Sequence, residues 1–228
     1  MQTVIIAGGL GTRLRPLTFE VPKPMVLINS RPFVEHLVLM LKKQGMKDFV
    51  FCVGYLSEQF VSHFGDGRRF GVSIRYSVED EPLGTGGALR KAKRWLDDSF
   101  ITVYGDTYVP IDYRRLAAYH SKKGRMGTAT IYDNSKHIAV NNMRLGKDGL
   151  IAAYDKKNPE GMEGLDAGVC VFNKSVLKFI PEGRKVSLEM EVFPQLIARH
   201  ELAGFKTSKR FYDMGTPERL RETREKLK

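Results

Sequence analysis

The chain has 228 residues, of which 42% are hydrophobic, and its formal net charge is +11. This composition is that of a globular protein with enough apolar material for a substantial core. We expect no membrane span, because no run of about 18 apolar residues occurs, and no secretory signal precedes the first strand. Both cysteines, Cys52 and Cys170, lie in apolar runs typical of strands. Buried free thiols at these positions suit a reducing cytoplasm.

The positive charge raises the hypothesis of nucleic-acid binding. The basic residues are scattered over several segments, however, and aromatic residues do not interleave with them as in a base-stacking surface. A solvated basic surface or a site for small polyanions fits this pattern better. We therefore expect neither nucleic acid nor a membrane as partner.

The first half of the chain alternates between short apolar runs and amphipathic segments. In chain order the pattern predicts a strand over 3–7, a helix over 33–44, a strand from residue 49, an amphipathic segment over 57–64, a strand over 73–76, a helix opened by PLGTGG at 82–87 and a strand over 100–104. Such alternation with uninterrupted apolar strands indicates a mainly parallel sheet with helices on both faces.

The second half is less regular. The pattern predicts a hairpin over 143–154 around GKDG, a strand over 165–172, a helix over 187–200 and a short extended segment over 211–213. Thr216 and Pro217 are the cap and first-turn proline of a closing helix. No repeat or linker occurs, so we predict one doubly wound α/β domain over residues 1–228.

The stretch AGGLGTRLRPLT at 7–18 follows the first predicted strand and combines three glycines with two arginines. Glycines let a ligand approach the backbone closely, and both exposed N–H groups and arginines bind anions. The loop lacks the third glycine of a dinucleotide-binding fingerprint, and no Walker A sequence is present. Lys23, between Pro22 and Pro24, is expected in an extended segment that fixes its ammonium near the loop. Together these residues predict a phosphate site.

Open α/β sheets bind ligands at the carboxyl ends of their strands. Both glycine loops, Asp106 and Asp213 are predicted to lie at such ends. Alone, each aspartate is more typical of a turn or a helix cap. Only their combination with the phosphate loop favours a metal site.

GGLGTRL followed by PKP at 22–24 resembles the signature of the sugar-1-phosphate nucleotidylyltransferases. PLGTGGAL at 82–89, Gly105-Asp106, DAG at 166–168 and DMGTPE at 213–218 resemble later motifs of this family in the same order. The resemblance spans nearly the whole chain and implies a Rossmann-like nucleotidyltransferase domain. Among short members, the chain most resembles the mannose- and manno-heptose-1-phosphate guanylyltransferases.

The resemblance implies a role for each matched residue. Arg13 and Lys23 would be catalytic, Arg13 holding the triphosphate and Lys23 holding phosphate during transfer, and Asp106 and Asp213 would bind Mg²⁺. The implied nucleotide-binding residues are Ala7, Gly8, Gly9, Gly11, Thr12, Arg13, Glu81, Pro82, Gly84, Thr85 and Gly105. The implied sugar-phosphate-binding residues are Lys157, Gly168 and Glu189.

The implied reaction converts an NTP and a sugar 1-phosphate into an NDP-sugar and pyrophosphate by in-line displacement. A phosphate monoester is largely ionised near neutral pH, since its second pKa is about 6, and needs no general base. The protein has to bring two polyanions together and offset the charge of the departing pyrophosphate. Cationic side chains, glycine amides and Mg²⁺ suffice for this task.

Two positions depart from the family pattern, both on the sugar side. Lys156 stands where the family commonly has glutamate, and Asp166 where it has asparagine.

Guanine is the favoured base, because the acids at 79–81 can accept its two adjacent donors, although solvated loop acids fit equally well. A uridylyl- or thymidylyltransferase acting on another sugar 1-phosphate, a non-catalytic nucleotide-binding relative and a nucleic-acid-binding protein are the alternatives. A homodimer is possible.

Overall fold

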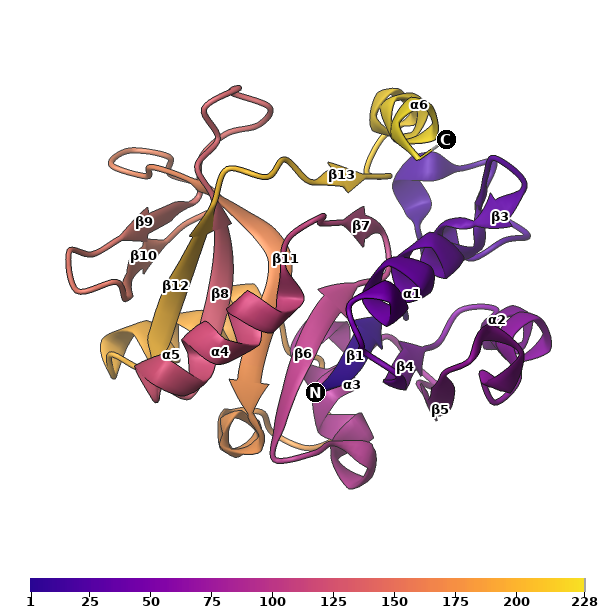
Figure 1. Cartoon of the computed structure of the whole chain (residues 1–228), viewed down its shortest axis with the longest axis horizontal. Helices are drawn as coiled ribbons and strands as arrows, with labels where there is room; N and C mark the ends of the chain where they lie inside the picture. The colour runs from indigo at the N-terminus through magenta and orange to yellow at the C-terminus, as the bar shows by residue number, and fades with distance from the viewer. Residues whose placement is uncertain (228) are drawn as a thin grey trace.

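The computed structural model describes residues 1–227 (Figure 1). The strands are β1 (Gln2–Ile6), β2 (Leu27–Ile28), β3 (Arg31–Pro32), β4 (Asp48–Val53), β5 (Ser73–Val78), β6 (Ser99–Tyr104), β7 (Thr107–Tyr108), β8 (Gly127–Tyr132), β9 (Met143–Leu145), β10 (Ile151–Tyr154), β11 (Leu165–Asn173), β12 (Leu202–Thr207) and β13 (Tyr212–Asp213). The α-helices are α1 (Phe33–Lys43), α2 (Ser57–Phe64), α3 (Gly84–Lys91), α4 (Tyr113–Lys123), α5 (Phe193–Ala198) and α6 (Pro217–Lys226).

Seven strands form one central sheet in the order β12-β8-β11-β6-β1-β4-β5. β1 pairs in parallel with β4 and β6, β5 with β4, and β12 with β8. Only β11 runs antiparallel to its neighbours in this sheet, β6 and β8. The predicted mainly parallel α/β sheet is therefore confirmed, and the carboxyl ends of six strands meet at one edge.

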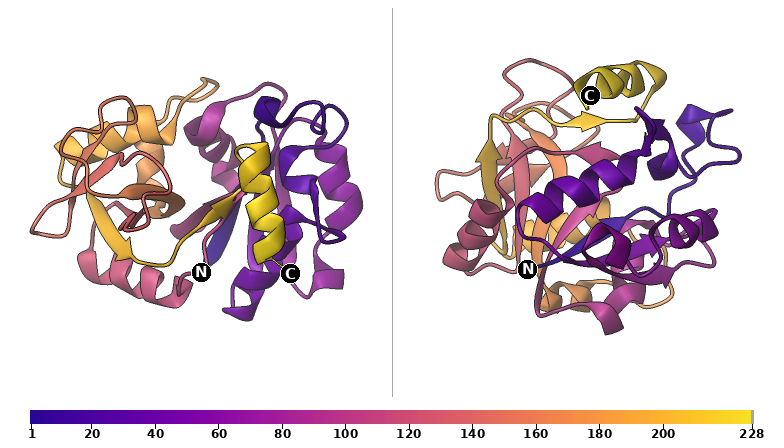
Figure 2. Two further views of the ribbon diagram at one scale, coloured as in Figure 1. Left: turned by 90° about the horizontal axis from the view of Figure 1, so that it is seen from above. Right: turned by 45° about the vertical axis from the view of Figure 1, so that its right-hand side comes forward.

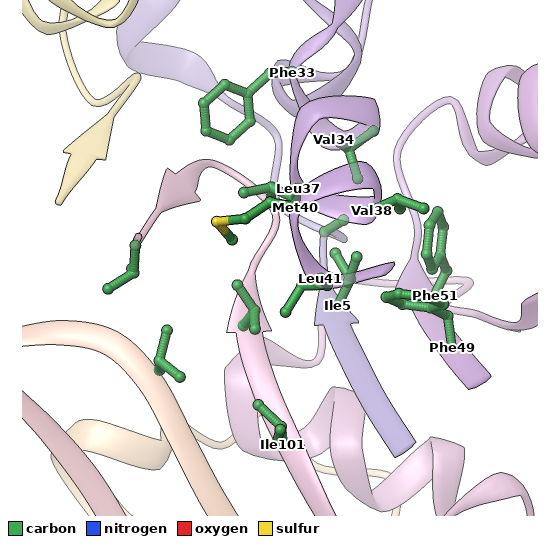
Figure 3. Packing of buried hydrophobic residues seen from close by; sticks show 14 of the residues in the cluster. Ile5, Phe33, Val34, Leu37, Val38, Met40, Leu41, Phe49, Phe51 and Ile101 are labelled. Atoms are coloured by element: carbon green, nitrogen blue, oxygen red, sulfur yellow. The ribbon is translucent and has the colours of Figure 1, made fainter. Parts of the chain in front are cut away.

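Helices cover both faces of the sheet because successive strand residues point to opposite sides. On one face, Ile5 packs with Phe49 and Phe51 under Val38 and Leu41 of α1, and α4 covers the same face (Figures 2 and 3). On the other face, Val4 and Val50 pack against α3, and α5 lies farther along it. Cys52 and Cys170 are buried free thiols, as predicted.

Among the α-helices and the strands of the central sheet, three elements lie outside the predictions. Helix α4 was not expected, because its buried face has only Tyr113, Leu116 and His120. Strands β8 and β12 were also not predicted. None of the described helices is long and apolar enough to cross a membrane.

The predicted helix over 187–200 is a π-helical turn, Leu188–Val192, followed by the short helix α5. Pro194 explains the break, because it has no N–H to donate to the carbonyl four residues earlier. The helix opened by PLGTGG is also short. α3 ends at Lys91 and continues as a 3₁₀ turn over Ala92–Trp95.

The closing segment brings the end of the chain back over the carboxyl edge of the sheet (Figures 1 and 2). β13 pairs antiparallel with β7, so that Asp213 lies opposite Thr107. The hydroxyl of Thr216 accepts from the backbone N–H of Arg219, which confirms the predicted cap of α6. This arrangement places the second aspartate of the sequence analysis beside the first.

Candidate active site

A cavity of about 390 Å³ lies at the carboxyl edge of the sheet, between the first glycine loop and the π-helical turn. Its lining contains ten of the residues singled out in the sequence: Ala7, Gly8, Gly9, Gly11, Thr12, Arg13, Lys23, Thr85, Asp106 and Glu189. Ile6, Pro24, Tyr104 and Lys156 complete it. Residues far apart in the chain thus meet because parallel strands end at one edge.

The glycine loop is folded around Lys23. Gly11 has a φ of +63°, and a Cβ added there would lie 3.0 Å from the Cβ of Lys23. Thr18 Oγ1 donates to the carbonyl of Gly11 at 2.9 Å, which closes the loop. Arg13 lies in the 3₁₀ turn that follows, anchored by the buried Leu14, and its exposed side chain lines the cavity.

Lys23 is buried and faces Asp106. Its Nζ lies 2.6 Å from Asp106 Oδ2, and the residue is 7% exposed. The extended segment expected for Lys23 is wrong, because Lys23–Met25 forms a 3₁₀ turn with Pro24 inside it. The turn still fixes the ammonium at the cavity, because the buried Pro24 and Met25 hold it in place.

Asp213 ends β13, and Asp106 directly precedes β7, the strand that pairs with β13. The backbone N–H of Met214 donates to the carbonyl of Asp106 at 3.2 Å. Asp106 Oδ1 also accepts from the hydroxyl of Thr107 at 3.1 Å. Asp213 does not line the cavity; its two carboxylate oxygens accept from the N–H of Gly215 at 2.6 Å and from Arg219 Nη1 at 2.7 Å.

These two carboxylates fit a hard divalent cation in their donor chemistry. Within residues 1–227, no group of three or more His, Cys, Asp and Glu side chains is placed to hold a metal. Mg²⁺ commonly takes one or two protein carboxylates and completes its shell with water and substrate phosphates. Two aspartates beside a phosphate loop therefore match Mg²⁺ better than a metal that needs a full protein cage.

Glu189 is a buried acid of the π-helical turn, 4% exposed, and lines the cavity. Its Oε2 accepts from Ser187 Oγ at 2.6 Å and from Thr85 Oγ1 at 3.1 Å. Burial raises the pKa of the Glu189 carboxyl, and the hydrogen bond from Thr85 partly offsets this rise. Thr85 Oγ1 in turn accepts from the N–H of Leu188 at 2.8 Å. The second glycine loop is thereby joined to the acid.

Lys156, rather than Lys157, lies at the cavity. The preference for Lys157 in the sequence is not supported by the geometry. Strand β10 ends at Tyr154, and the carboxylate of Asp155 then accepts from the N–H groups of Lys157 and Asn158, at 2.7 and 3.1 Å. This turn places Lys157 at an exposed position away from the cavity lining.

Lys156 lies near Asp166, where the sequence departs from the family a second time. Burial raises the pKa of the Asp166 carboxyl, while the N–H of Gly168 and the charge of Lys156 lower it. Both departures therefore occur together on the same side of the site.

A smaller hollow of about 170 Å³ adjoins Gly8 and contains the acid cluster of the second glycine loop. Glu79 is 7% exposed, and its Oε2 accepts from the N–H of Leu83 at 2.9 Å. Burial raises the pKa of its carboxyl. Asp80, Glu81 and Pro82 line the same hollow, but Asp80 is exposed and pairs with Lys91 at 2.6 Å. Of the three acids, only Glu79 is buried in this hollow.

Three of the predicted glycines pack against protein instead of lining the cavity. A Cβ at Gly84 would lie 2.6 Å from the carbonyl oxygen of Val186, and one at Gly168 would lie 2.8 Å from the ring of Tyr104. A Cβ at Gly105 would meet that of Ala7 at 3.0 Å. Tyr104 itself lines the cavity and was missed in the sequence. Its place at the end of β6, directly before Gly105-Asp106, is the signal that could have identified it.

A cavity at the ends of parallel strands, with glycine amides and cations on its walls, defines an α/β protein that binds phosphorylated ligands. The chain matches the model of the Nucleotidyl transferase family over residues 2–228. It therefore belongs to this family, as the sequence motifs indicated.

The chain is 31% identical to D-glycero-alpha-D-manno-heptose 1-phosphate guanylyltransferase of Aneurinibacillus thermoaerophilus, covering 100% of this chain and 98% of that protein. It is 32% identical to the mannose-1-phosphate guanylyltransferase of Mycobacterium tuberculosis, but spans only 62% of that relative's length. The crystal structure of HddC from Yersinia pseudotuberculosis is similar over 100% of this chain and 99% of that one, with 27% identity and a TM-score of 0.84. The same protein complexed with GMP-PN gives a TM-score of 0.82 at 26% identity.

Proposed function

We propose that this protein is a Mg²⁺-dependent enzyme that transfers a guanylyl group from GTP to mannose 1-phosphate or a manno-heptose 1-phosphate and releases pyrophosphate. One observation carries the proposal: a single cavity is lined by Arg13 after the glycine loop, by Lys23 and by Lys156, which follows β10 in the second half of the chain. Two anionic substrates can be held face to face there. The names of the full-length relative and of the GMP-PN complex support guanine as the base and a manno sugar as the acceptor.

In this proposal, the residues of the chain act by placing and neutralising phosphates. The amides of the glycine loop and Arg13 bind the triphosphate, and Lys23 stabilises the negative charge that accumulates during displacement at the α-phosphorus. Lys156 holds the sugar phosphate so that its oxygen is in line for attack. Asp106 and Asp213 would hold Mg²⁺, which supplies further charge neutralisation to the phosphates.

Glu79 is the residue that we propose reads guanine. Guanine presents two adjacent donors on its Watson–Crick edge, and a carboxylate accepts two parallel donors well. Replacing Glu79 with glutamine leaves one oxygen and adds a donor. A hydrogen bond to a charged group contributes about 1.5–3 kcal/mol, so Glu79→Gln should lower kcat/KM for GTP by about 10- to 100-fold. The value for UTP should change little, and an equal loss for both nucleotides would contradict this role.

The reaction is tested by measuring pyrophosphate release for a matrix of NTPs and sugar 1-phosphates. We expect the highest kcat/KM for GTP with a manno-configured 1-phosphate and a loss of activity without Mg²⁺. Highest activity with UTP or dTTP would replace guanylyl transfer by uridylyl or thymidylyl transfer. No release with any pair, together with intact nucleotide binding, would identify a non-catalytic relative.

A further inference from the structure

A second cavity lies against the C-terminal half of α3, away from the active-site cavity. Its volume is about 740 Å³, which exceeds the 390 Å³ of the first cavity and suits a small molecule. Five cationic side chains line it: Arg90, Lys91, Lys93, Arg94 and Lys174. Three acids, Asp80, Glu81 and Glu182, are also present. None of these residues lines the active-site cavity, although Asp80 and Glu81 also line the hollow at Gly8.

Two acids of the second cavity form ion pairs that are exposed to solvent. Glu182 pairs with Arg90 at 3.3 Å, and its side chain is 85% exposed. Asp80 pairs with Lys91 at 2.6 Å, and its side chain is 91% exposed. Exposed ion pairs of this kind contribute little stability. An entering polyanion can therefore displace both acids at low cost.

The cations of the cavity have unused capacity to bind an anion. Among the described residues, neither Lys93 nor Arg94 makes an ion pair, and the guanidinium of Arg94 lies over the ring of Trp95, with its Cζ 4.8 Å from the ring centroid. Arg90 Nε is buried without any hydrogen-bond partner among residues 1–227. A buried N–H without an acceptor is unfavourable, and the Nη2 of Arg90 is bonded only to the exposed Glu182.

Basic residues at a helix C-terminus often do no more than offset the helix dipole. This explanation suffices for Arg90 and Lys91 in the last turn of α3. It does not apply to Lys174, which comes from a separate 3₁₀ segment, Lys174–Phe179, that follows β11 and whose Nζ donates to the carbonyl of Leu96. Cations from two distant parts of the chain around one hollow indicate a site for an anion.

We infer that the second cavity binds a small molecule carrying two or more phosphate groups and that its occupancy changes the acceptor side of the active site. The second part of this inference rests on the proposed function. Charge attraction of this kind weakens with ionic strength. Binding at the second cavity should therefore be strongest at low salt.

The two cavities share one chain segment. Residues 182 and 183 line the second cavity, and Glu189 lines the first. Between them, the N–H of Val186 donates to the carbonyl of Leu83 at 2.8 Å, and the N–H of Gly86 donates to the carbonyl of Val186 at 2.8 Å. A Cβ at Gly87 would lie 2.6 Å from the carbonyl oxygen of Arg184. A shift of this segment therefore has to move either α3 or Glu189.

Isothermal titration calorimetry with inorganic tripolyphosphate tests the binding. We expect two tripolyphosphate sites on the unmodified protein. In the double variant Lys93→Glu/Arg94→Glu, the affinity of the second cavity should fall at least about tenfold, so that calorimetry detects only the active-site cavity. The double variant Arg115→Glu/Lys122→Glu on the exposed side of α4 changes the net charge equally and should retain both sites. Lys23→Ala should weaken the other site. Equal stoichiometry in all variants, or the same loss in the α4 control, would overturn the inference.

Repeating the titration with a nucleoside diphosphate distinguishes a nucleotide from an inorganic polyphosphate, because only a base-dependent gain in affinity indicates a nucleotide.

The kinetic arm measures KM for the sugar phosphate at saturating NTP, with and without tripolyphosphate. We expect a change of at least about twofold in the unmodified protein and none in Lys93→Glu/Arg94→Glu. Binding without any kinetic change would reject the coupling. Calorimetry needs no turnover, so an inactive protein would reject the proposed function and leave the binding result valid.

Discussion

The hydroxyl of Thr85 links the nucleotide loop to the acid that we place beside the acceptor sugar, and removing it gives a sharp test. Thr85→Val keeps the shape of the side chain but loses the donor to Glu189 Oε2 at 3.1 Å and the acceptor for Leu188 N–H at 2.8 Å. Ser187 Oγ still donates to the carboxylate at 2.6 Å. Glu189 therefore keeps one of its two side-chain donors.

The size of the expected KM change follows from the charge of Glu189, which accepts the hydrogen bond from Thr85. A hydrogen bond to an ionised group contributes about 1.5–3 kcal/mol, which corresponds to about 10- to 100-fold in an equilibrium constant. We expect KM for the sugar phosphate to rise by about tenfold, since Ser187 retains part of the orientation. KM for the NTP should change much less, because the glycine loop and Arg13 hold that substrate. Thr85→Ser keeps the hydroxyl and should restore most of the loss.

The same variant predicts a shift in the pH profile. Burial raises the pKa of Glu189, and the Thr85 hydrogen bond lowers it. The ionised carboxylate is the form that accepts from sugar hydroxyls, so activity is present above this pKa and is lost as the pH falls through it. Without the hydroxyl the pKa rises further, and the acid limb of kcat/KM for the sugar phosphate should move to higher pH. An unchanged limb, with KM raised equally for both substrates, would refute the link.

Three further outcomes test the remaining assignments. Lys23→Ala should lower kcat by at least ~10²-fold, on the scale of losing one preorganised electrostatic contact, and near-normal turnover would reject its role. Asp213→Asn should weaken the response of activity to Mg²⁺ in a metal titration. The control Arg219→Gln removes only the ion pair and should retain that response. An unchanged titration in Asp213→Asn would limit this residue to anchoring α6. Lys156→Ala should raise KM for the sugar phosphate more than for the NTP, and Lys157→Ala should have the smaller effect; the reverse order would restore the prediction made from the sequence.

The site could be predicted from the sequence wherever strand order alone determines the position. The glycine loop follows β1 and Asp106 follows β6, and these neighbouring parallel strands end at the same edge. Lys23 joins them because the chain turns back beneath the loop, which the flanking prolines indicated only in part. The end of a parallel strand can be located from a short stretch of sequence, because one apolar run and the turn after it suffice to identify it.

Lys156 could not be assigned in this way. The alternation of side chains holds only inside a strand, and β10 ends two residues before Lys156. The carboxylate of Asp155 then sets the turn by accepting from two following N–H groups, so the direction of each lysine depends on side-chain geometry. The antiparallel direction of β11 could not be predicted from its own residues either. The direction of a strand is determined by the connections on either side of it.

The glycines of GTGG at 84–87 show how one motif can serve packing and substrate at once. A Cβ at Gly84 would lie 2.6 Å from the Val186 carbonyl oxygen, and one at Gly87 equally close to that of Arg184. These glycines therefore let the segment before the π-helical turn lie directly on the start of α3. Close backbone contact leaves that segment little freedom to move independently, and it carries Glu189 to the cavity with Thr85 as its hydrogen-bond partner. The absence of side chains in this loop thus positions Glu189 at the cavity, although sequence alone suggested only room for a nucleotide.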